Sequence, residues 1–165
     1  MARILIVGGG CRGRQLAAAT AGEGYAVRIT SRSEDARAAI EASGAECWIG
    51  TPDRIATLRG SLENVTLLCW LLGTAVGPPD QLHALHTSRL EYFLTQAIDT
   101  TVRGVLYEAR GSGRSTEAVA EGELVARAVA ERNQIPVAFL TADPHALDGW
   151  LAQARAAVSS LLIRA

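Results

Sequence analysis

Short, β-branched apolar runs alternate along the chain with longer, alanine-rich stretches in which apolar and polar residues mix. This alternation of two periodicities predicts strands separated by helices. The predicted strands are Ile4–Val7, Tyr25–Thr30, Glu46–Ile49, Val65–Leu72, Val102–Tyr107 and Pro136–Leu140. The predicted helices span about Arg12–Ala21, Glu34–Ser43, Pro52–Gly60, the Gly77–Asp80 turn to Thr100, Thr116–Asn133 and Pro144–Leu162.

Regular strand–helix alternation indicates βαβ units, a parallel sheet and right-handed crossovers. The run Val65–Leu72 is apolar at almost every position, which is typical of a central parallel strand covered on both faces. Six strands then predict an α/β, doubly wound, mainly parallel sheet in the order 3-2-1-4-5-6, with helices on both faces. We find no linker or repeat, so residues 1–165 are expected to form one domain.

A glycine-rich turn follows the first predicted strand directly. The segment Gly8–Gly13 contains the pattern G-x-G-x-x-G at Gly8, Gly10 and Gly13, between an apolar strand and a helix. Gly8 permits the tight turn, Gly10 lets a diphosphate approach the backbone, and Gly13 lets the helix pack closely on the sheet. Free N–H groups and the positive helix end then face the phosphates. The alternative is a tight turn that binds nothing, with Arg12 solvated.

The end of the second predicted strand indicates which dinucleotide fits. NAD sites usually have an acidic residue here, about 20 residues after the glycines, which holds the ribose 2′-hydroxyl. This chain has Ser31, Arg32 and Ser33 instead, and its first acid, Glu34, lies in the next predicted helix. Arg32 can pair with a 2′-phosphate, to which Ser31 and Ser33 can donate hydrogen bonds. We expect NADP(H); the alternative is NAD(H), with Glu34 turned back to the ribose.

Together these segments resemble the NAD(P)-binding Rossmann-fold proteins of the short-chain dehydrogenase/reductase type, especially the extended and atypical (NmrA-like) branch. The similar stretches are Ile4–Ala18, Val27–Ser33, Gly50–Asp53 and Leu71–Gly73. The resemblance covers the first half of the chain well, and the second half only in its order of strands and helices. It implies cofactor contacts at Gly8, Gly10, Cys11, Arg12, Gly13, Arg32, Asp53 and Gly73.

The chain departs from that family at the residues that perform its chemistry. Val7 stands where the first glycine of the family's loop would fall. The family's enzymes use a Tyr-x-x-x-Lys pair, whereas Tyr92 is followed four residues later by Gln96. All 16 basic residues are arginine, so no lysine amine exists. The standard mechanism is therefore excluded. The chain ends soon after its sixth predicted strand, so we expect no separate substrate domain.

Three residues around the end of the fifth predicted strand are weak catalytic candidates. Glu108, Arg110 and Tyr107 would project, with Ser112, at the carboxyl edge near the nicotinamide end. A carboxylate beside an arginine can assist proton transfer. The alternative is a solvated loop with a local ion pair.

No set of residues indicates a metal site. His83 and His86 share a helical face but have no third ligand nearby, and zinc needs at least three protein ligands. We interpret both as helix-surface histidines. The 3 cysteines lack metal or redox spacing, which favours a reduced, cytoplasmic protein.

The net charge and the hydropathy of the chain limit the classes of partner that we expect. The net charge of −1 and a pI of about 6.3 disfavour nucleic acid and anionic membranes. The apolar run Val65–Leu72 is much shorter than the ~20 residues of a membrane helix, and no signal peptide is expected. The predicted helix that ends near Thr100 is longer than a crossover requires, so it is a candidate homodimer interface.

Three functions remain open. The first is a sensor or regulatory protein that binds NADP(H) without turning it over. The second is a small NADPH-dependent reductase, an oxidoreductase that uses non-standard residues after the fifth strand. The third is a cofactor-free Rossmann-fold interaction protein.

Overall fold

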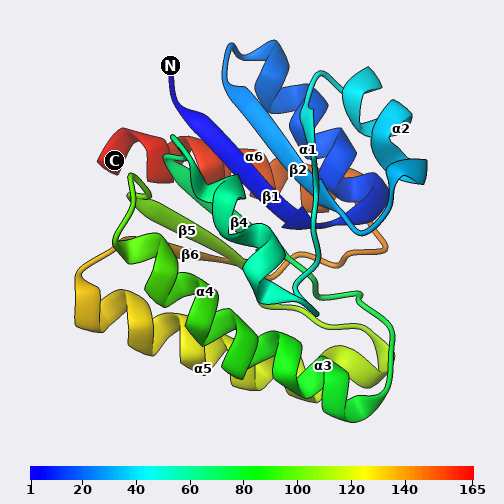
Figure 1. Cartoon of the computed structure of the whole chain (residues 1–165), viewed down its shortest axis with the longest axis vertical. Helices are drawn as coiled ribbons and strands as arrows, with labels where there is room; N and C mark the ends of the chain where they lie inside the picture. The colour runs from blue at the N-terminus through cyan, green and yellow to red at the C-terminus, as the bar shows by residue number, and fades with distance from the viewer.

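A six-stranded parallel sheet forms the middle layer of the molecule, in the order β3-β2-β1-β4-β5-β6. The computed structural model describes all 165 residues (Figure 1). The strands are β1 (Arg3–Gly8), β2 (Ala26–Ser31), β3 (Glu46–Ile49), β4 (Leu67–Leu71), β5 (Gly104–Glu108) and β6 (Val137–Leu140). The predicted fold class and strand order are confirmed.

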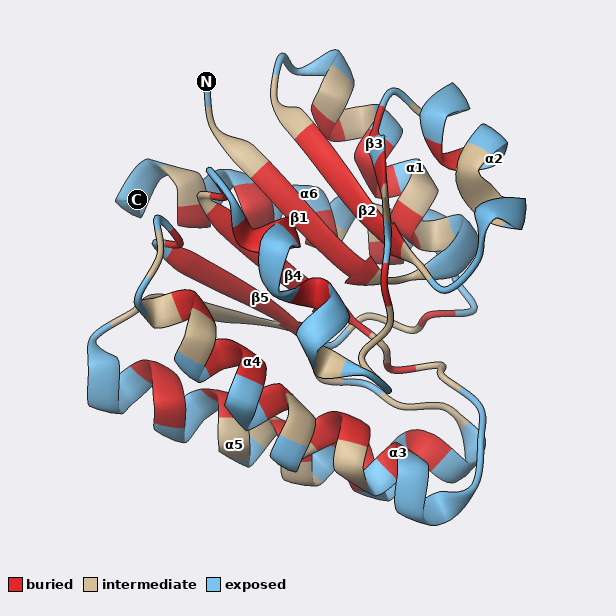
Figure 2. Cartoon of the chain, viewed as in Figure 1, coloured by how far each residue is buried: buried red, intermediate tan, exposed pale blue.

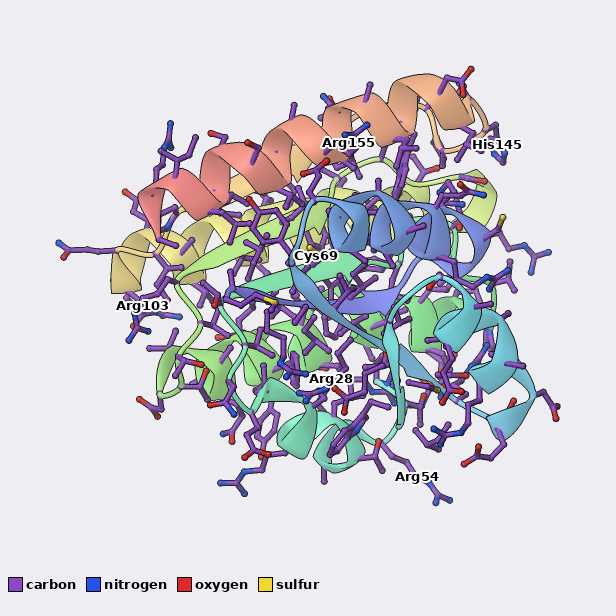
Figure 3. All side chains as sticks on the ribbon, turned by 90° about the horizontal axis from the view of Figure 1, so that it is seen from above. Arg28, Arg54, Cys69, Arg103, His145 and Arg155 are labelled. Atoms are coloured by element: carbon purple, nitrogen blue, oxygen red, sulfur yellow. The ribbon has the colours of Figure 1, made fainter.

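Helices cover both faces of this sheet. The α-helices are α1 (Gly10–Gly22), α2 (Arg37–Ala42), α3 (Pro79–His86), α4 (Ser88–Ile98), α5 (Thr116–Asn133) and α6 (Leu147–Arg164). Three 3₁₀ helices, η1 (Glu34–Ala36), η2 (Ile55–Leu62) and η3 (Gly113–Ser115), lie in the connections. Helices α1 and α6 pack side by side on one face, whereas α4 and α5 cover the other (Figures 1 and 3). Figure 3 also shows Cys69 of β4 in the interior and His145 beside the start of α6.

The alternation of side chains along β1 divides the core into two clusters. Ile4 and Ile6 face α1 and α6, whereas Leu5 and Val7 face η2 and helices α3–α5. Each cluster contains 18 buried residues. Every residue of β4 and β5 is buried (Figure 2), because both strands lie between helices on two faces.

Two predicted helices differ from the structure. The helix expected to reach Thr100 is broken at Thr87, whose φ of −121° and ψ of −90° are not helical. The Thr87 hydroxyl donates to the His83 carbonyl oxygen at 2.7 Å, and the preceding His86 side chain is buried. The helix predicted at Pro52–Gly60 is instead η2, where the Trp48 indole N–H donates to the Thr57 carbonyl oxygen at 2.9 Å.

The sheet order reverses between β1 and β4, whose carboxyl ends lie side by side with Gly8 opposite Leu71. In doubly wound sheets ligands bind at this point, because the connecting loops diverge there and leave a crevice. No helix in the structure combines the length and the apolar character that crossing a membrane requires.

Candidate functional site

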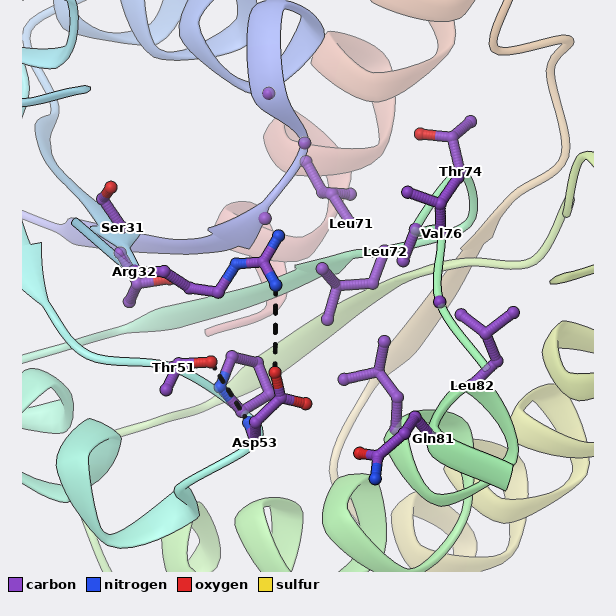
Figure 4. Close-up of a pocket in the computed structure, with 18 of the residues that line it drawn as sticks. Ser31, Arg32, Thr51, Asp53, Leu71, Leu72, Thr74, Val76, Gln81 and Leu82 are labelled. Atoms are coloured by element: carbon purple, nitrogen blue, oxygen red, sulfur yellow. Dashed lines mark hydrogen bonds and ion pairs between the residues drawn. The ribbon is translucent and has the colours of Figure 1, made fainter. Parts of the chain in front are cut away.

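A cavity of about 490 Å³ opens at the carboxyl edge of the sheet, at the switch point between β1 and β4 (Figure 4). Its walls come from the glycine turn after β1, the end of β2, the loop after β3, and the loop after β4 with helix α3. The lining includes Gly8, Gly9, Gly10, Cys11, Arg12, Ser31, Arg32, Thr51, Asp53, Leu71, Leu72, Thr74, Gln81, Leu82 and Leu85. This volume lies within the usual range of small-molecule and cofactor sites, about 300–1,000 Å³.

The glycine turn presents bare backbone to this cavity. Helix α1 begins at Gly10, its N-cap is Gly9 with φ 85°, and no side chain caps it. The Gly13 N–H donates to the Gly9 carbonyl at 2.9 Å, so the amides of Gly10, Cys11 and Arg12 precede this first bond. These amides and the positive end of the helix macrodipole form an anion-binding position.

Two glycines of the turn serve different purposes. A Cβ on Gly13 would lie 2.8 Å from the Gly8 carbonyl oxygen, so only glycine lets the helix approach the strand this closely. A Cβ on Gly10 would meet no heavy atom within 4 Å, because that position faces open space. Gly13 therefore acts through packing, and Gly10 keeps the cavity clear for a ligand.

The end of β2 places two of its three predicted residues in the lining of the cavity and the third outside it. The Arg32 side chain is 74% exposed, and its Nη1 lies 3.9 Å from Asp53 Oδ2. Ser31 lines the cavity, but its hydroxyl donates to the Ser33 carbonyl oxygen at 2.8 Å. Ser33 is not part of the lining. Arg32 is thus a largely solvated cation at the mouth of the cavity (Figure 4).

Glu108 lies beneath the cavity, behind the turn that follows β4. Its carboxylate accepts hydrogen bonds from the Gly73 N–H at 2.7 Å and from the Trp150 indole N–H at 2.7 Å. Arg12 Nη2 lies 3.4 Å from the same carboxylate and donates to the Thr74 hydroxyl at 3.1 Å. The solvated loop considered for Glu108 is wrong, because this side chain is 0% exposed. Glu108 thus links the glycine turn, the β4 loop and α6.

Arg12 is oriented by this arrangement. Its guanidinium lies 5.3 Å from the centre of the Trp150 ring, and its Nε is buried without a hydrogen-bond partner. Arg12 nevertheless lines the cavity, whereas the predicted contact residues Gly13 and Gly73 lie behind the wall.

His86 and Tyr107 form a buried polar pair below the β4 loop. The His86 Nε2 lies 3.1 Å from the Leu72 carbonyl oxygen, and Nδ1 lies 2.8 Å from the Tyr107 hydroxyl. A carbonyl only accepts, so Nε2 carries the proton and Nδ1 accepts from Tyr107. Burial lowers the pKa of His86 to about 4, and burial raises the pKa of Tyr107 well above its usual range. The prediction of a surface His86 is wrong, because the side chain is 0% exposed.

The remaining candidates, Arg110 and Ser112, lie in the loop after β5 and contact residues of the loop after β6. Arg110 Nη2 lies 3.9 Å from Asp143 Oδ2, with both side chains about half exposed. His145 Nε2 lies 3.3 Å from the Ser112 hydroxyl. None of these four residues lines the cavity. No group of three or more His, Cys, Asp or Glu side chains is arranged to hold a metal ion.

Several lining residues were not predicted from the sequence. Thr74, Gln81, Leu82 and Leu85 come from the β4 loop and α3, and Arg89 of α4 reaches Asp53 from behind the wall at 2.9 Å. The helix start at Gly77–Asp80 was the available signal, because helices after a switch-point strand flank the ligand crevice.

At the level of sequence, no protein-family model and no curated protein matches this chain. The fold matches solved structures, one of which is described as a short-chain dehydrogenase/reductase superfamily protein. One is a superfamily protein from Agrobacterium tumefaciens with bound NAD, with a TM-score of 0.68 and 16% identity over 83% of this chain and 48% of that chain. A UDP-glucose 4-epimerase from Thermotoga maritima matches with a TM-score of 0.70 and 13% identity, over 83% of this chain and 54% of that chain.

A third similar structure is vestitone reductase from alfalfa, with a TM-score of 0.61 and 13% identity, over 84% of this chain and 56% of that chain. The present chain thus spans about half the length of these proteins. At these identities the likeness to the three structures concerns the fold alone.

Proposed function

We propose that this chain binds a nicotinamide dinucleotide at the carboxyl edge of its sheet, prefers NADP(H) to NAD(H), and acts as a sensor or regulatory protein. The observation that carries the proposal is the uncapped start of α1 at Gly10, which faces a cavity with Arg32 at its mouth. The neighbour from Agrobacterium has NAD bound, which supports the same ligand class here.

The residues present fit such a cofactor. The amides of Gly10, Cys11 and Arg12 would hold the diphosphate, since no side chain of the protein caps them. Arg32 would hold the 2′-phosphate, because its exposed guanidinium can form a bidentate pair with phosphate oxygens. Apolar side chains of α3, Leu82 and Leu85, supply a wall against which a flat ring can pack.

The sensor role rests on the surroundings of the candidate acids. A bound nicotinamide supplies hydride transfer, and a reductase must add a proton donor. Tyr107 is held by His86 in the core, and Glu108 is held by Gly73, Trp150 and Arg12. Neither lines the cavity. The reductase alternative would therefore depend on the exposed residues Arg110 and His145 and on the partly buried Ser112.

Fluorescence titration of the purified chain with NADPH and with NADH tests the proposal. We expect NADPH to bind about tenfold more tightly, because a charge-assisted hydrogen bond contributes roughly 1.5–3 kcal/mol. Arg32→Gln should remove this advantage and leave NADH affinity within about twofold. Arg132→Gln, which removes an exposed arginine of α5, is the matched control.

Two results would contradict the proposal. Markedly tighter binding of NADH would overturn the NADP(H) preference. If neither cofactor binds at millimolar concentration, the remaining function is that of a cofactor-free interaction protein. Steady oxidation of NADPH with a carbonyl substrate would count against the sensor role and favour the reductase.

The homodimer expected from the helix after β4 is also a proposal. In the structure this helix is α3 followed by α4, and α4 presents a half-exposed aromatic residue, Tyr92. Light scattering of the purified chain measures the mass directly: about twice the mass of one chain supports the dimer, and a monomer contradicts it.

A further inference from the structure

A carboxylate lies at the cavity mouth between two arginines from different elements. Asp53, in the loop after β3, has Oδ1 at 2.9 Å from Arg89 Nη1 and Oδ2 at 3.9 Å from Arg32 Nη1. Figure 4 shows the Asp53 side chain turned toward Arg32. Asp53 and Arg32 line the cavity, whereas Arg89 of α4 is not part of its lining.

The two arginines are held very differently. Arg89 is only 24% exposed, and its Nη1 also donates to the Gln81 side-chain oxygen at 3.3 Å. Arg32 is 74% exposed and has only the long contact with Asp53. The Asp53 backbone N–H donates to the Thr51 hydroxyl at 3.2 Å, which holds the backbone of Asp53 within its own loop. Arg89 is thus the closer and less exposed partner of Asp53, whereas the guanidinium of Arg32 is largely open to another partner.

The charges explain why this matters for an NADP(H) site. A phosphate monoester carries about −1.5 to −2 charges at pH 7 and would be repelled by a nearby carboxylate. Asp53 and Arg32 alone sum to zero, so Arg32 would be neutralised by its own neighbour. Arg89 adds the charge that leaves the trio with a net positive charge, and it holds the carboxylate at its far oxygen.

We propose that Arg89 is a positioning residue that determines cofactor selectivity: by holding and neutralising Asp53, it leaves Arg32 available for a 2′-phosphate. The proposal rests on the proposed function, since it concerns the same cavity. Arg89 acts through Asp53 and need not touch the cofactor. Its loss should therefore weaken binding of the phosphorylated dinucleotide and leave the unphosphorylated one unchanged.

The experiment measures dissociation constants of NADPH and NADH for the full chain and five variants. Arg89→Gln should weaken NADPH about fivefold and change NADH less than twofold, because only NADPH has the 2′-phosphate. Asp53→Asn should tighten NADPH about threefold. The double variant should bind NADPH at least as tightly as wild type, since the carboxylate is then absent. Arg132→Gln controls for the lost positive charge.

A variant that keeps the charge guards against misfolding. Arg89→Lys should retain most of the NADPH selectivity, and the thermal midpoint of every variant shows whether it is folded. If Arg89→Gln does not fold, Asp53→Asn decides the question: an unchanged NADPH constant would contradict the inference, because Asp53 would then exert no repulsion for Arg89 to neutralise.

Defined results would overturn the inference. If wild type prefers NADPH through Arg32 but Arg89→Gln leaves the ratio unchanged, or weakens both cofactors equally, the role of Arg89 is wrong and the proposed function stands. If Asp53→Asn weakens NADH, Asp53 contacts the ribose and is not an obstacle that Arg89 neutralises. If wild type binds neither cofactor, the proposed function and this inference both fail.

Discussion

At the scale of single residues, the buried imidazole of His86 couples folding to pH. Burial lowers its folded-state pKa to about 4, from an ordinary value of 6.5. Between these values the unfolded chain binds a proton that the folded chain does not, so the folded state loses stability as pH falls. Above pH 6.5 the free energy of unfolding is unaffected by this proton. By pH 4 the protonation of unfolded His86 has lowered it by about 3 kcal/mol.

The variant His86→Gln isolates this effect, because glutamine can still donate to the Leu72 carbonyl but does not titrate. We expect the stability advantage of wild type over the variant to shrink by about 3 kcal/mol between pH 7 and pH 4. Urea unfolding at a series of pH values measures it, and carboxylates shared by both proteins cancel in the difference. Parallel pH curves for the two proteins would show that His86 does not titrate in this way.

The residues that the sequence did not predict correctly are polar groups whose partners lie far away in the chain. Glu108 was placed at the right edge of the sheet, but its burial depends on Arg12 and Trp150, which are distant in sequence. The spacing of His86 and His83 on one helix suggested a polar surface position for His86. Its burial is explained by its contact with Tyr107 of β5. Arg89 has no local signal at all for its contact with Asp53, 36 residues earlier.

At the scale of elements, the turn from β1 into α1 contains a position, Gly10, where an added side chain would meet no protein atom and would enter the space of the ligand. A Cβ on Gly10 meets no protein atom within 4 Å, and its φ is 52°. Gly10→Ala should therefore fold with a loss of about 1–2 kcal/mol from the left-handed backbone. Its methyl group lies where we place the diphosphate, so NADPH affinity should fall tenfold or more.

The matched control for this variant is Gly24→Ala. Gly24 also has a positive φ, 95°, and open space around its Cβ, but it follows the other end of α1. Its loss of stability should be similar and its NADPH dissociation constant unchanged. Equal weakening of binding in both variants would indicate a general effect of strain.

Periodicity predicted the strands well because a parallel strand buried on both faces is apolar throughout, as in β4. The order of the strands followed from the alternation of strands and helices and from the handedness of crossovers. The helix break at Thr87 was not predicted because the spacing of apolar residues does not register its two causes. The Thr87 hydroxyl donates to the carbonyl of His83 in the previous turn, and the His86 side chain points into the core toward Tyr107. Such features override propensity within one turn of helix.

At the scale of the whole molecule, the cavity is assembled from segments spread over the first half of the chain. Gly8, Arg32, Asp53 and Leu72 follow four successive strands and meet at one edge, because parallel strands end on the same side. The second half of the chain supports this wall from below through Glu108 and Trp150. The sequence therefore predicted that the glycine turn and Arg32 lie at one edge of the sheet, and the tertiary structure added the neighbours of that edge, among them Glu108 and Arg89.

The most direct test of this account records amide chemical shifts of the ¹⁵N-labelled chain as NADP⁺ is added. The largest shifts are expected at the amides of Gly10, Cys11 and Arg12, with the Arg32 side chain also perturbed, because these groups face the cavity. Saturating NADP⁺ that leaves these amides unshifted, or that shifts only residues elsewhere on the molecule, would contradict it.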